Sequence, residues 1–139
     1  MIPAQDHLDG LCTTHGLLAV YLFGSRSEDG LRLLEGEPVE APGSDLDVGV
    51  VFPGKVPGPW PLGGLQVDLE EIFAPLRIDL VPLQKVDALF QFDAIDGHRI
   101  AASDAERADE WELVVMRRAA ELLPIQRQLE LDRFGVTTE

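Results

Sequence analysis

Seven consecutive apolar residues, from Leu17 to Phe23, lie between Gly16 and Gly24. A buried helix needs a longer run, and this segment is rich in the residue types that favour strands. A strand that is covered on both faces explains the run, because both sets of its alternating side chains are then apolar. The chain is therefore expected to build a sheet around this segment.

Helix and strand patterns alternate along the rest of the chain. We expect helices over 3–15, 65–74 and 86–95, and strands over 45–52, 77–81 and 98–102. A long final helix is expected after Ser103 and Asp104, up to residue 134, with a kink or an interruption at Pro124. This order predicts an α+β domain, a small mixed sheet packed by helices, with one domain over 1–139.

Two segments have the composition of loops. Residues 27–44 are acidic and rich in glycine and proline, and residues 53–64 hold four prolines and four glycines. Such clusters break regular structure. We therefore expect an acidic loop insertion over about 27–44, with at most one helical turn at 31–34, and no regular structure over 53–64.

The charge limits the classes of function that are open to the domain. The 139 residues carry 11 basic and 25 acidic side chains, a formal net charge of −14. Because nucleic acids bind positive surfaces, this balance argues against a DNA or RNA partner and favours a basic partner or bound cations. No apolar run approaches the roughly 20 residues that span a bilayer. The first residues also lack a signal-peptide pattern, so we expect a cytoplasmic protein that does not bind membranes.

Three aspartates are candidates for a metal site. Asp45 and Asp47 are two residues apart at the start of a strand, so both side chains project from the same face. Asp79 alternates with apolar residues in the next strand and can face the same way. Like charges this close repel unless a cation compensates them, and Mg²⁺ prefers hard oxygen ligands. Three such carboxylates can hold two ions about 3.5–4 Å apart.

A glycine–serine turn, Gly24-Ser25-Arg26, follows the first strand directly. Glycine lets the backbone approach a ligand closely, and successive amides in such a turn can hold phosphate oxygens. Arg26 either offers a countercharge to phosphate or forms an exposed ion pair with Glu28 or Asp29. Each feature alone is more often a surface turn or a solvated charge. Their order along the chain is what indicates a phosphate and metal site.

Three segments in this order resemble the signature of the polymerase-β-like nucleotidyltransferase superfamily. They are Leu22-Phe23-Gly24-Ser25-Arg26, Ser44-Asp45-Leu46-Asp47-Val48 and Ile78-Asp79-Leu80-Val81. The later helix, glycine turn, short strand and long helix are similar to the minimal nucleotidyltransferases of prokaryotes, so the resemblance covers nearly the whole chain. Members of this group are often antitoxins that silence a HEPN-domain ribonuclease toxin by transferring AMP from ATP to a tyrosine.

The resemblance implies a nucleotidyltransferase that moves AMP from ATP onto a hydroxyl of a HEPN toxin and releases pyrophosphate. It implies that two Mg²⁺ ions are held by Asp45, Asp47 and Asp79. Two roles are open to Asp79: ligand of the ion beside the attacking oxygen, and acceptor of the hydroxyl proton. The residues implied around the triphosphate are Gly24, Ser25, Arg26 and Ser44. No base-reading motif is visible, so ATP rests on the resemblance alone.

Two other functions stay open. Residues 26–44, 19 in number, separate Ser25 from Asp45, more than this family usually has. The acidic loop and the net charge favour a non-catalytic module that neutralises a basic partner by occlusion. Transfer to a small-molecule acceptor is the third possibility, although the short chain leaves nothing beyond the domain to bind one.

Two further residues have more than one interpretation. Cys12, the only cysteine, excludes an internal disulfide and lies on an apolar helical face, which favours a core residue over a nucleophile. Trp60 lies between two prolines, as a loop residue or as an exposed contact for a partner or a base.

Overall fold

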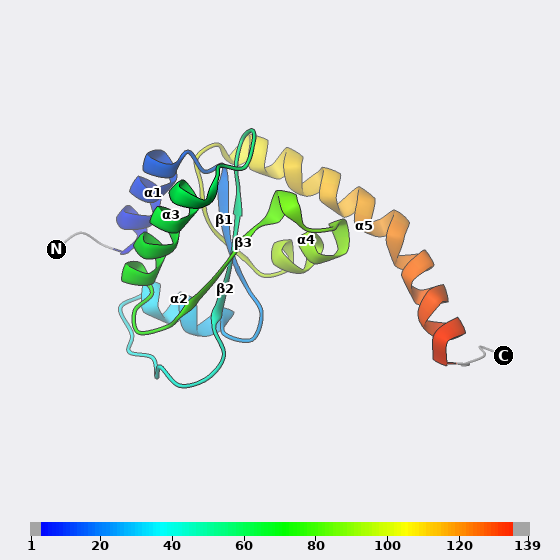
Figure 1. The fold of residues 1–139 in the computed structure, drawn as a ribbon, viewed down its shortest axis with the longest axis horizontal. Helices are drawn as coiled ribbons and strands as arrows, with labels where there is room; N and C mark the ends of the chain where they lie inside the picture. The colour runs from blue at the N-terminus through cyan, green and yellow to red at the C-terminus, as the bar shows by residue number, and fades with distance from the viewer. Residues whose placement is uncertain (1–3, 135–139) are drawn as a thin grey trace.

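A mixed four-stranded sheet forms the centre of the computed structural model, which describes residues 4–134 (Figure 1). The strands are β1 (Ala19–Phe23), β2 (Leu46–Val51), β3 (Ile78–Pro82) and β4 (His98–Ala102). The helices are α1 (Ala4–His15), α2 (Ser27–Leu34), α3 (Pro59–Ile72), α4 (Ala88–Ile95) and α5 (Ala105–Phe134), with a short 3₁₀ helix η1 (Leu83–Lys85). The expected α+β architecture is confirmed.

The strand order β3-β2-β1-β4 places β1 inside the sheet. β1 is antiparallel to both β2 and β4, whereas β2 and β3 are parallel. All five residues of β1 are buried, as the apolar run from Leu17 predicts. Val20 and Leu22 pack in one core cluster with apolar residues of α1 and α3, while Tyr21 and Phe23 pack in a second cluster with residues of α4 and α5. The strand is therefore covered on both faces.

Helix α2 begins earlier than the sequence suggests. It spans Ser27–Leu34, where we expected a loop with one turn at 31–34. Gly30 lies where this helix crosses the sheet, and a Cβ atom there would come within 2.7 Å of the Leu22 side chain. Glycine thus permits close packing instead of breaking the helix. Glu28 and Asp29 in the first turn also face the positive end of the helix dipole. The irregular part of the acidic segment therefore starts at Glu35.

Helix α3 begins at Pro59, inside the segment that we expected to be irregular. The first residues of a helix have no intrahelical partner for their N–H groups, so proline costs little in the first turn. Further along, Leu65 and Leu69 of the helix and Phe73 directly after it are buried in the core cluster that covers the sheet. Trp60 is 92% exposed near its start.

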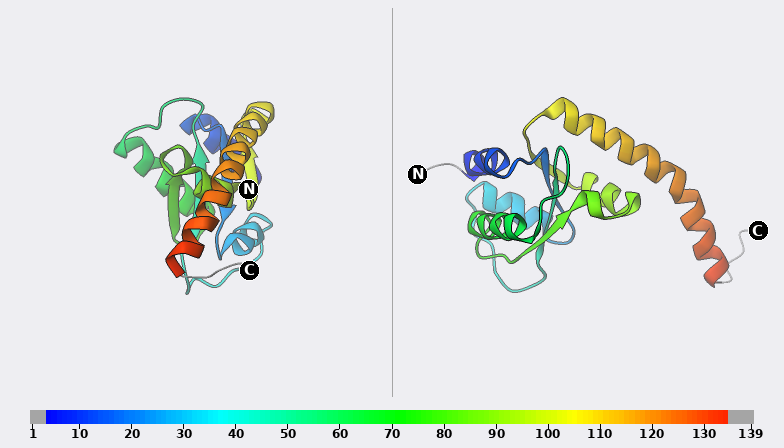
Figure 2. Two further views of the ribbon diagram at one scale, coloured as in Figure 1. Left: turned by 90° about the vertical axis from the view of Figure 1, so that its right-hand side faces the viewer. Right: turned by 45° about the horizontal axis from the view of Figure 1, so that its top comes forward.

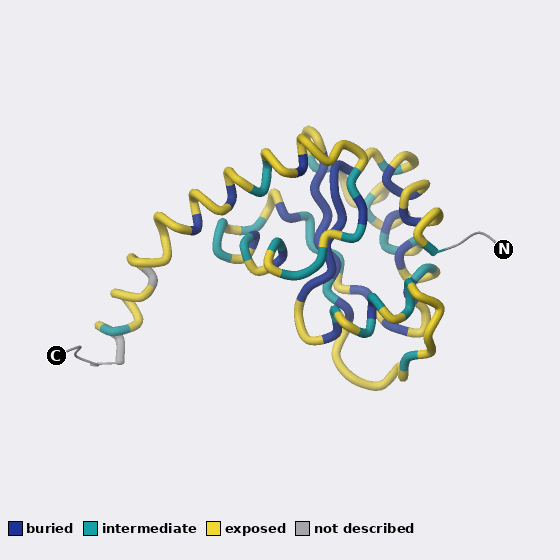
Figure 3. Tube along the Cα trace, turned by 180° about the vertical axis from the view of Figure 1, so that it is seen from behind, coloured by how far each residue is buried: buried dark blue, intermediate teal, exposed yellow. Residues whose placement is uncertain are grey.

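Helix α5 runs over 30 residues, including Pro124, without interruption. The figures show that it curves and extends beyond the body of the domain (Figures 1 and 2). Val115 and Ala119 of this helix are buried, but Leu122, further along the helix, is 38% exposed. Figure 3 shows why: the later turns lie beyond the sheet and are exposed. Among the described residues, no helix combines the length and apolar character needed to cross a bilayer.

Cys12 is part of the core, in agreement with the sequence. Its side chain packs in the cluster of α1, α3 and the sheet and is 4% exposed. Burial, with a smaller contribution from the nearby charge of Asp9, raises the pKa of the thiol to about 11. The thiolate, which is the reactive form, is therefore scarce at neutral pH.

We expect the Cys12 thiol of the folded protein to resist a disulfide reagent such as Ellman's reagent at pH 8, because the thiol is buried and protonated. The same protein in a denaturing concentration of urea should release one equivalent of the coloured product within minutes. Equal rates in the two conditions would contradict the burial of this side chain.

Two glycines should respond in opposite ways to alanine. A Cβ atom at Gly97 would collide with the main-chain oxygen of Leu22, whereas nothing lies within 4 Å of one at Gly10 in α1. We expect Gly97→Ala to lower the free energy of unfolding by about 1–3 kcal/mol or more. Gly10→Ala should raise it by about 0.5–1 kcal/mol, since alanine is the better helix former. Urea denaturation of both variants measures the two effects, and destabilisation by Gly10→Ala would be inconsistent with the open surroundings of that residue.

Candidate active site

Two of the three candidate aspartates meet at the pairing of β2 with β3. Asp47 and Asp79 are partners in the register of these parallel strands, so their side chains lie on the same face of the sheet. Their neighbours Leu46, Val48 and Ile78 pack on the opposite face, in the cluster with α1 and α3. The alternation in each strand therefore brings the two carboxyl groups together.

The two carboxyl groups lie close enough to interact, and this favours the protonated form of Asp47. The pKa of Asp47 is raised to about 6, first by burial, then by the hydrogen bond to Asp79 and by the charges of Asp79 and Asp45. A divalent cation would compensate the charges of both carboxylates. Mg²⁺ is commonly held by one or two carboxylates together with substrate phosphates, so this pair fits an Mg²⁺ ion that arrives with a triphosphate.

Asp45 lies apart from this pair. It precedes β2, is exposed, and is close enough to contribute to the raised pKa of Asp47. Within residues 4–134, however, no three histidine, cysteine, aspartate or glutamate side chains converge on a position where they could hold one ion. The structure thus assembles Asp47 and Asp79 and leaves Asp45 at the edge of the site.

The Gly24–Ser25 turn lies against the carboxylates. Gly24 has a φ angle of +77°, and a Cβ atom there would collide with Asp47 Oδ2, so both the backbone conformation and the available space require glycine. Ser25 is exposed, and its hydroxyl lies 2.8 Å from that of Ser44. The turn therefore lies against the carboxyl group of Asp47, as the order of the motifs suggests, and Ser44 lies beside the turn.

Helix α4 supplies one wall of the site, which sequence reasoning missed. Phe90 and Asp93 line an open pocket of about 530 Å³ together with Phe23, Gly24, Asp47 and Asp79. Phe90 is 40% exposed, and its ring meets that of Phe23 edge to face, with centroids 5.8 Å apart. The spacing of Phe90 and Asp93 puts them on one helical face, but nothing in the sequence says that this face turns toward the aspartates.

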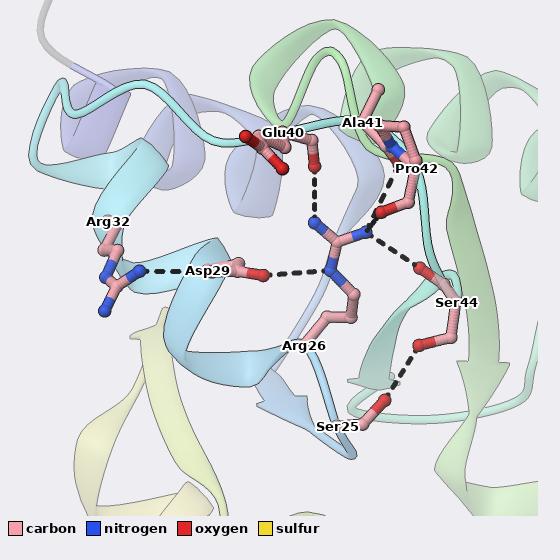
Figure 4. A network of polar contacts seen from close by, with 8 residues as sticks. All are labelled: Ser25, Arg26, Asp29, Arg32, Glu40, Ala41, Pro42 and Ser44. Carbon is pink, nitrogen blue, oxygen red and sulfur yellow. Dashed lines mark hydrogen bonds and ion pairs between the residues drawn. The ribbon is translucent and has the colours of Figure 1, made fainter.

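Arg26 does not reach this pocket. Its side chain is buried and turns toward the loop between α2 and β2 (Figure 4). Its Nε donates to Asp29 Oδ2 over 2.9 Å, which is one of the two pairings that the sequence offered. The expectation of an exposed pair is wrong, because the loop covers the guanidinium. Ser25, Arg26 and Ser44 line a second pocket of about 510 Å³.

No protein-family model and no curated protein matches the sequence, but solved structures match the fold over nearly its whole length. A complex of a tri-AMPylated HEPN toxin with an MNT antitoxin from Shewanella oneidensis has a TM-score of 0.63 and 15% identity, over 96% of this chain and 97% of that chain. A mutant MntA–HpeT toxin–antitoxin pair has a TM-score of 0.56 and 15% identity, over 95% and 93%. A toxin–antitoxin complex with AMP-PNP has a TM-score of 0.55 and 16% identity, over 95% and 94%. At such identities the likeness shows the fold, which confirms the architecture that the resemblance implies.

The raised pKa of Asp47 predicts a pH-dependent effect of Asp47→Asn. The pKa of Asp47 is about 6 in the folded protein and 3.8 in the unfolded chain. Ionisation of Asp47 therefore lowers the free energy of unfolding as the pH rises from about 4 to 6, and the loss persists at higher pH. The asparagine side chain stays neutral, and its amide can donate a hydrogen bond to the Asp79 carboxylate. In EDTA, the variant should therefore unfold at a higher urea concentration than the wild type at pH 8 and show little difference below pH 4.

Mg²⁺ provides the complementary measurement. At pH 8 it should stabilise the wild type more than Asp47→Asn, because the variant lacks one of the two charges that the ion compensates. Asp93→Asn, in the same pocket, is the matched control. Asp93→Asn should keep the wild-type response to Mg²⁺. If it weakened that response as much as Asp47→Asn does, the effect would belong to the charge of the whole pocket, which would contradict a specific Asp47–Asp79 pair.

Proposed function

We propose that this protein is an Mg²⁺-dependent nucleotidyltransferase that moves AMP from ATP onto a hydroxyl of a protein partner, a HEPN-domain toxin. The observation that supports it best is the Asp47–Asp79 pair beside the Gly24–Ser25 turn. Asp47, Asp79 and Gly24 line one pocket, and Ser25 follows Gly24 in the chain. Hard oxygen ligands beside a glycine–serine turn suit a metal-bound triphosphate. The fold is similar to that of a chain in a complex whose HEPN toxin carries AMP groups.

The carboxylates are assigned to the metal. Asp47 and Asp79 would hold Mg²⁺, and Asp45 would contribute its charge from the start of β2. Bound there, the ion would neutralise charge on the triphosphate and lower the pKa of the attacking hydroxyl. Asp47 has to lose its proton before it binds a cation, which its pKa of about 6 permits at neutral pH.

The other residues bind and orient the reactants. The amides of Gly24 and Ser25 hold phosphate oxygens, while the exposed ring of Phe90 excludes water from one side of the pocket. The acceptor oxygen forms a bond to the α-phosphorus, and the bond from that phosphorus to pyrophosphate breaks. The hydroxyl proton passes to a carboxylate, for which Asp79 is our candidate, and then to solvent.

A protein acceptor fits the size and the charge of the chain. The described residues form the sheet and its covering helices, without a further layer that could enclose a small acceptor. The net charge of −14 favours a basic partner, which a toxin that acts on RNA would be. The partner therefore has to bring its own hydroxyl to the open pocket at Asp47 and Asp79.

The decisive experiment combines this protein, labelled ATP, Mg²⁺ and a HEPN toxin encoded beside it. We expect label on the toxin, located by mass spectrometry on a hydroxyl side chain, and inactivation of the toxin. Asp47→Asn and Asp79→Asn should lower the rate by roughly a hundredfold or more, since each removes charge that supports transfer. Asp6→Asn on α1, across the sheet from the pocket, should leave it unchanged.

The controls separate the proposal from its alternatives. Neutralisation of the toxin without label, preserved in Asp47→Asn and Asp79→Asn, would replace the enzyme with a binding module. Label on a small molecule but on no protein would move the acceptor to another class. Substitution of each of the other three nucleoside triphosphates for ATP tests the base.

A further inference from the structure

Arg26 is the most completely bonded side chain near the site. Its side chain is 9% exposed, and Figure 4 shows the guanidinium surrounded by the loop that precedes β2. We call residues 40–44 of this loop the strap. Nη2 donates to the main-chain oxygen of Glu40 over 2.6 Å, and Nη1 lies 3.3 Å from the main-chain oxygens of Ala41, Pro42 and Ser44. All three guanidinium nitrogens are engaged, Nε by Asp29.

These contacts leave little capacity for a phosphate. An arginine has five N–H donors in a planar fork and accepts nothing. Here the fork faces main-chain oxygens, and its one negative partner, Asp29, is shared with Arg32, whose Nη1 lies 3.5 Å away. A role as a direct triphosphate contact would require Arg26 to release the strap first.

Gly43 shows that the strap is shaped around the guanidinium. Its φ angle is +132°, a conformation that favours glycine, and a Cβ atom there would lie 2.9 Å from Arg26 Nη1. A larger residue would push the guanidinium out of its place. The position of the Arg26 guanidinium therefore depends on a glycine at residue 43 of the strap.

The strap connects this arrangement to the candidate active site. It ends at Ser44, whose hydroxyl lies 2.8 Å from that of Ser25, and Asp45 and β2 follow at once. Arg26 in turn follows the Gly24–Ser25 turn in the chain. One side chain thus fixes the start of β2 relative to the turn that lies against Asp47.

We propose that Arg26 is a positioning residue, whose guanidinium holds the strap so that Ser44 and Asp45 stay beside the Gly24–Ser25 turn. It also supplies a positive charge within an acidic segment that includes Glu28, Asp29 and Glu40. Without this charge the acidic groups repel one another and the strap leaves the turn. The effect of Arg26 on the rate of transfer rests on the proposed function, whereas its effect on the strap does not.

The first test uses a glutamate-specific protease under native conditions. Arg26 Nη2 binds the carbonyl oxygen of the Glu40–Ala41 peptide bond, which is a bond that this protease cleaves. In Arg26→Met and Arg26→Lys, cleavage after Glu40 should be at least tenfold faster than in the wild type, because neither side chain reproduces the planar fork. Arg32→Met is the matched control. Arg32 shares Asp29 but is 60% exposed, so its removal should leave the cleavage rate unchanged.

The second test separates positioning from phosphate binding by steady-state kinetics of AMP transfer. Positioning predicts that kcat falls at least tenfold in both Arg26 variants, while KM for ATP stays within about threefold. A direct contact predicts a higher KM in Arg26→Met that Arg26→Lys largely restores, since lysine keeps the charge. That pattern, or wild-type cleavage at Glu40 in both variants, would overturn the proposal.

Two additions keep these outcomes decisive. Gly43→Ala disturbs the same contact from the exposed loop and should accelerate cleavage and lower kcat in the same way, even if an Arg26 variant fails to fold. Circular dichroism at the assay temperature establishes that each variant is folded. If the wild type transfers no AMP, the proposed function fails, but the protease test still decides whether Arg26 holds the strap.

Discussion

The parallel register of β2 and β3 is the constraint on which the candidate site depends. It places Asp47 opposite Asp79, and a slip by one residue would turn Asp79 toward the apolar cluster. The register is maintained by side chains on the other face, where Leu46, Val48 and Ile78 are buried. Burying one such side chain contributes about 1.5–3 kcal/mol, so the core can hold together two carboxyl groups that repel when ionised. The resulting charge is available to a cation.

A network of side chains on β1, β4 and α5 supports the sheet face on which the site lies. The Tyr21 hydroxyl donates to Glu112 Oε2 over 2.7 Å, and Arg99 Nη1 donates to Glu112 and to Asp109. Burial and the neighbouring Glu112 raise the pKa of Tyr21, so its hydroxyl stays a donor. This network joins β1, β4 and the start of α5. Because α5 packs on α4, it also supports the helix that carries Phe90 and Asp93.

The sequence predicts those features that depend on local pattern. The buried run from Leu17 and the alternation around Asp47 and Asp79 identify three strands, and the order of the motifs indicates the fold. Helices α2 and α3 begin earlier than predicted, because the prediction rests on glycine and proline as signs of loops. The effect of Gly30 and Pro59 depends on their positions in the fold, which composition does not describe. Gly30 is required by a close crossing of helix and sheet, and Pro59 is harmless because it stands in a first turn.

The candidate site shows the same division. Residue type and spacing identify Gly24 and the three aspartates as site candidates. The distances between the aspartates depend on the strand register, which pairs Asp79 with Asp47 and not with Asp45. Phe90 and Asp93 belong to a helix whose orientation is set by packing. The sequence offers Arg26 two kinds of partner, phosphate or an acidic neighbour, because it follows a phosphate-type turn and precedes Glu28 and Asp29. Its partners are main-chain oxygens of an irregular loop, and no pattern of side chains encodes them.

The length of the segment between α2 and β2 has a physical consequence for the site. Lengthening a flexible loop costs little free energy, so extra residues are tolerated, but a longer loop also gives its ends more freedom. The contacts of Arg26 begin at Glu40, and residues 35–39 precede them. The contacts of Arg26 with the strap therefore keep motion of residues 35–39 from displacing Asp45. In this arrangement, one arginine separates the acidic loop from the strand that carries the catalytic candidates, so that a change in residues 35–39 would leave the register of the carboxylates intact.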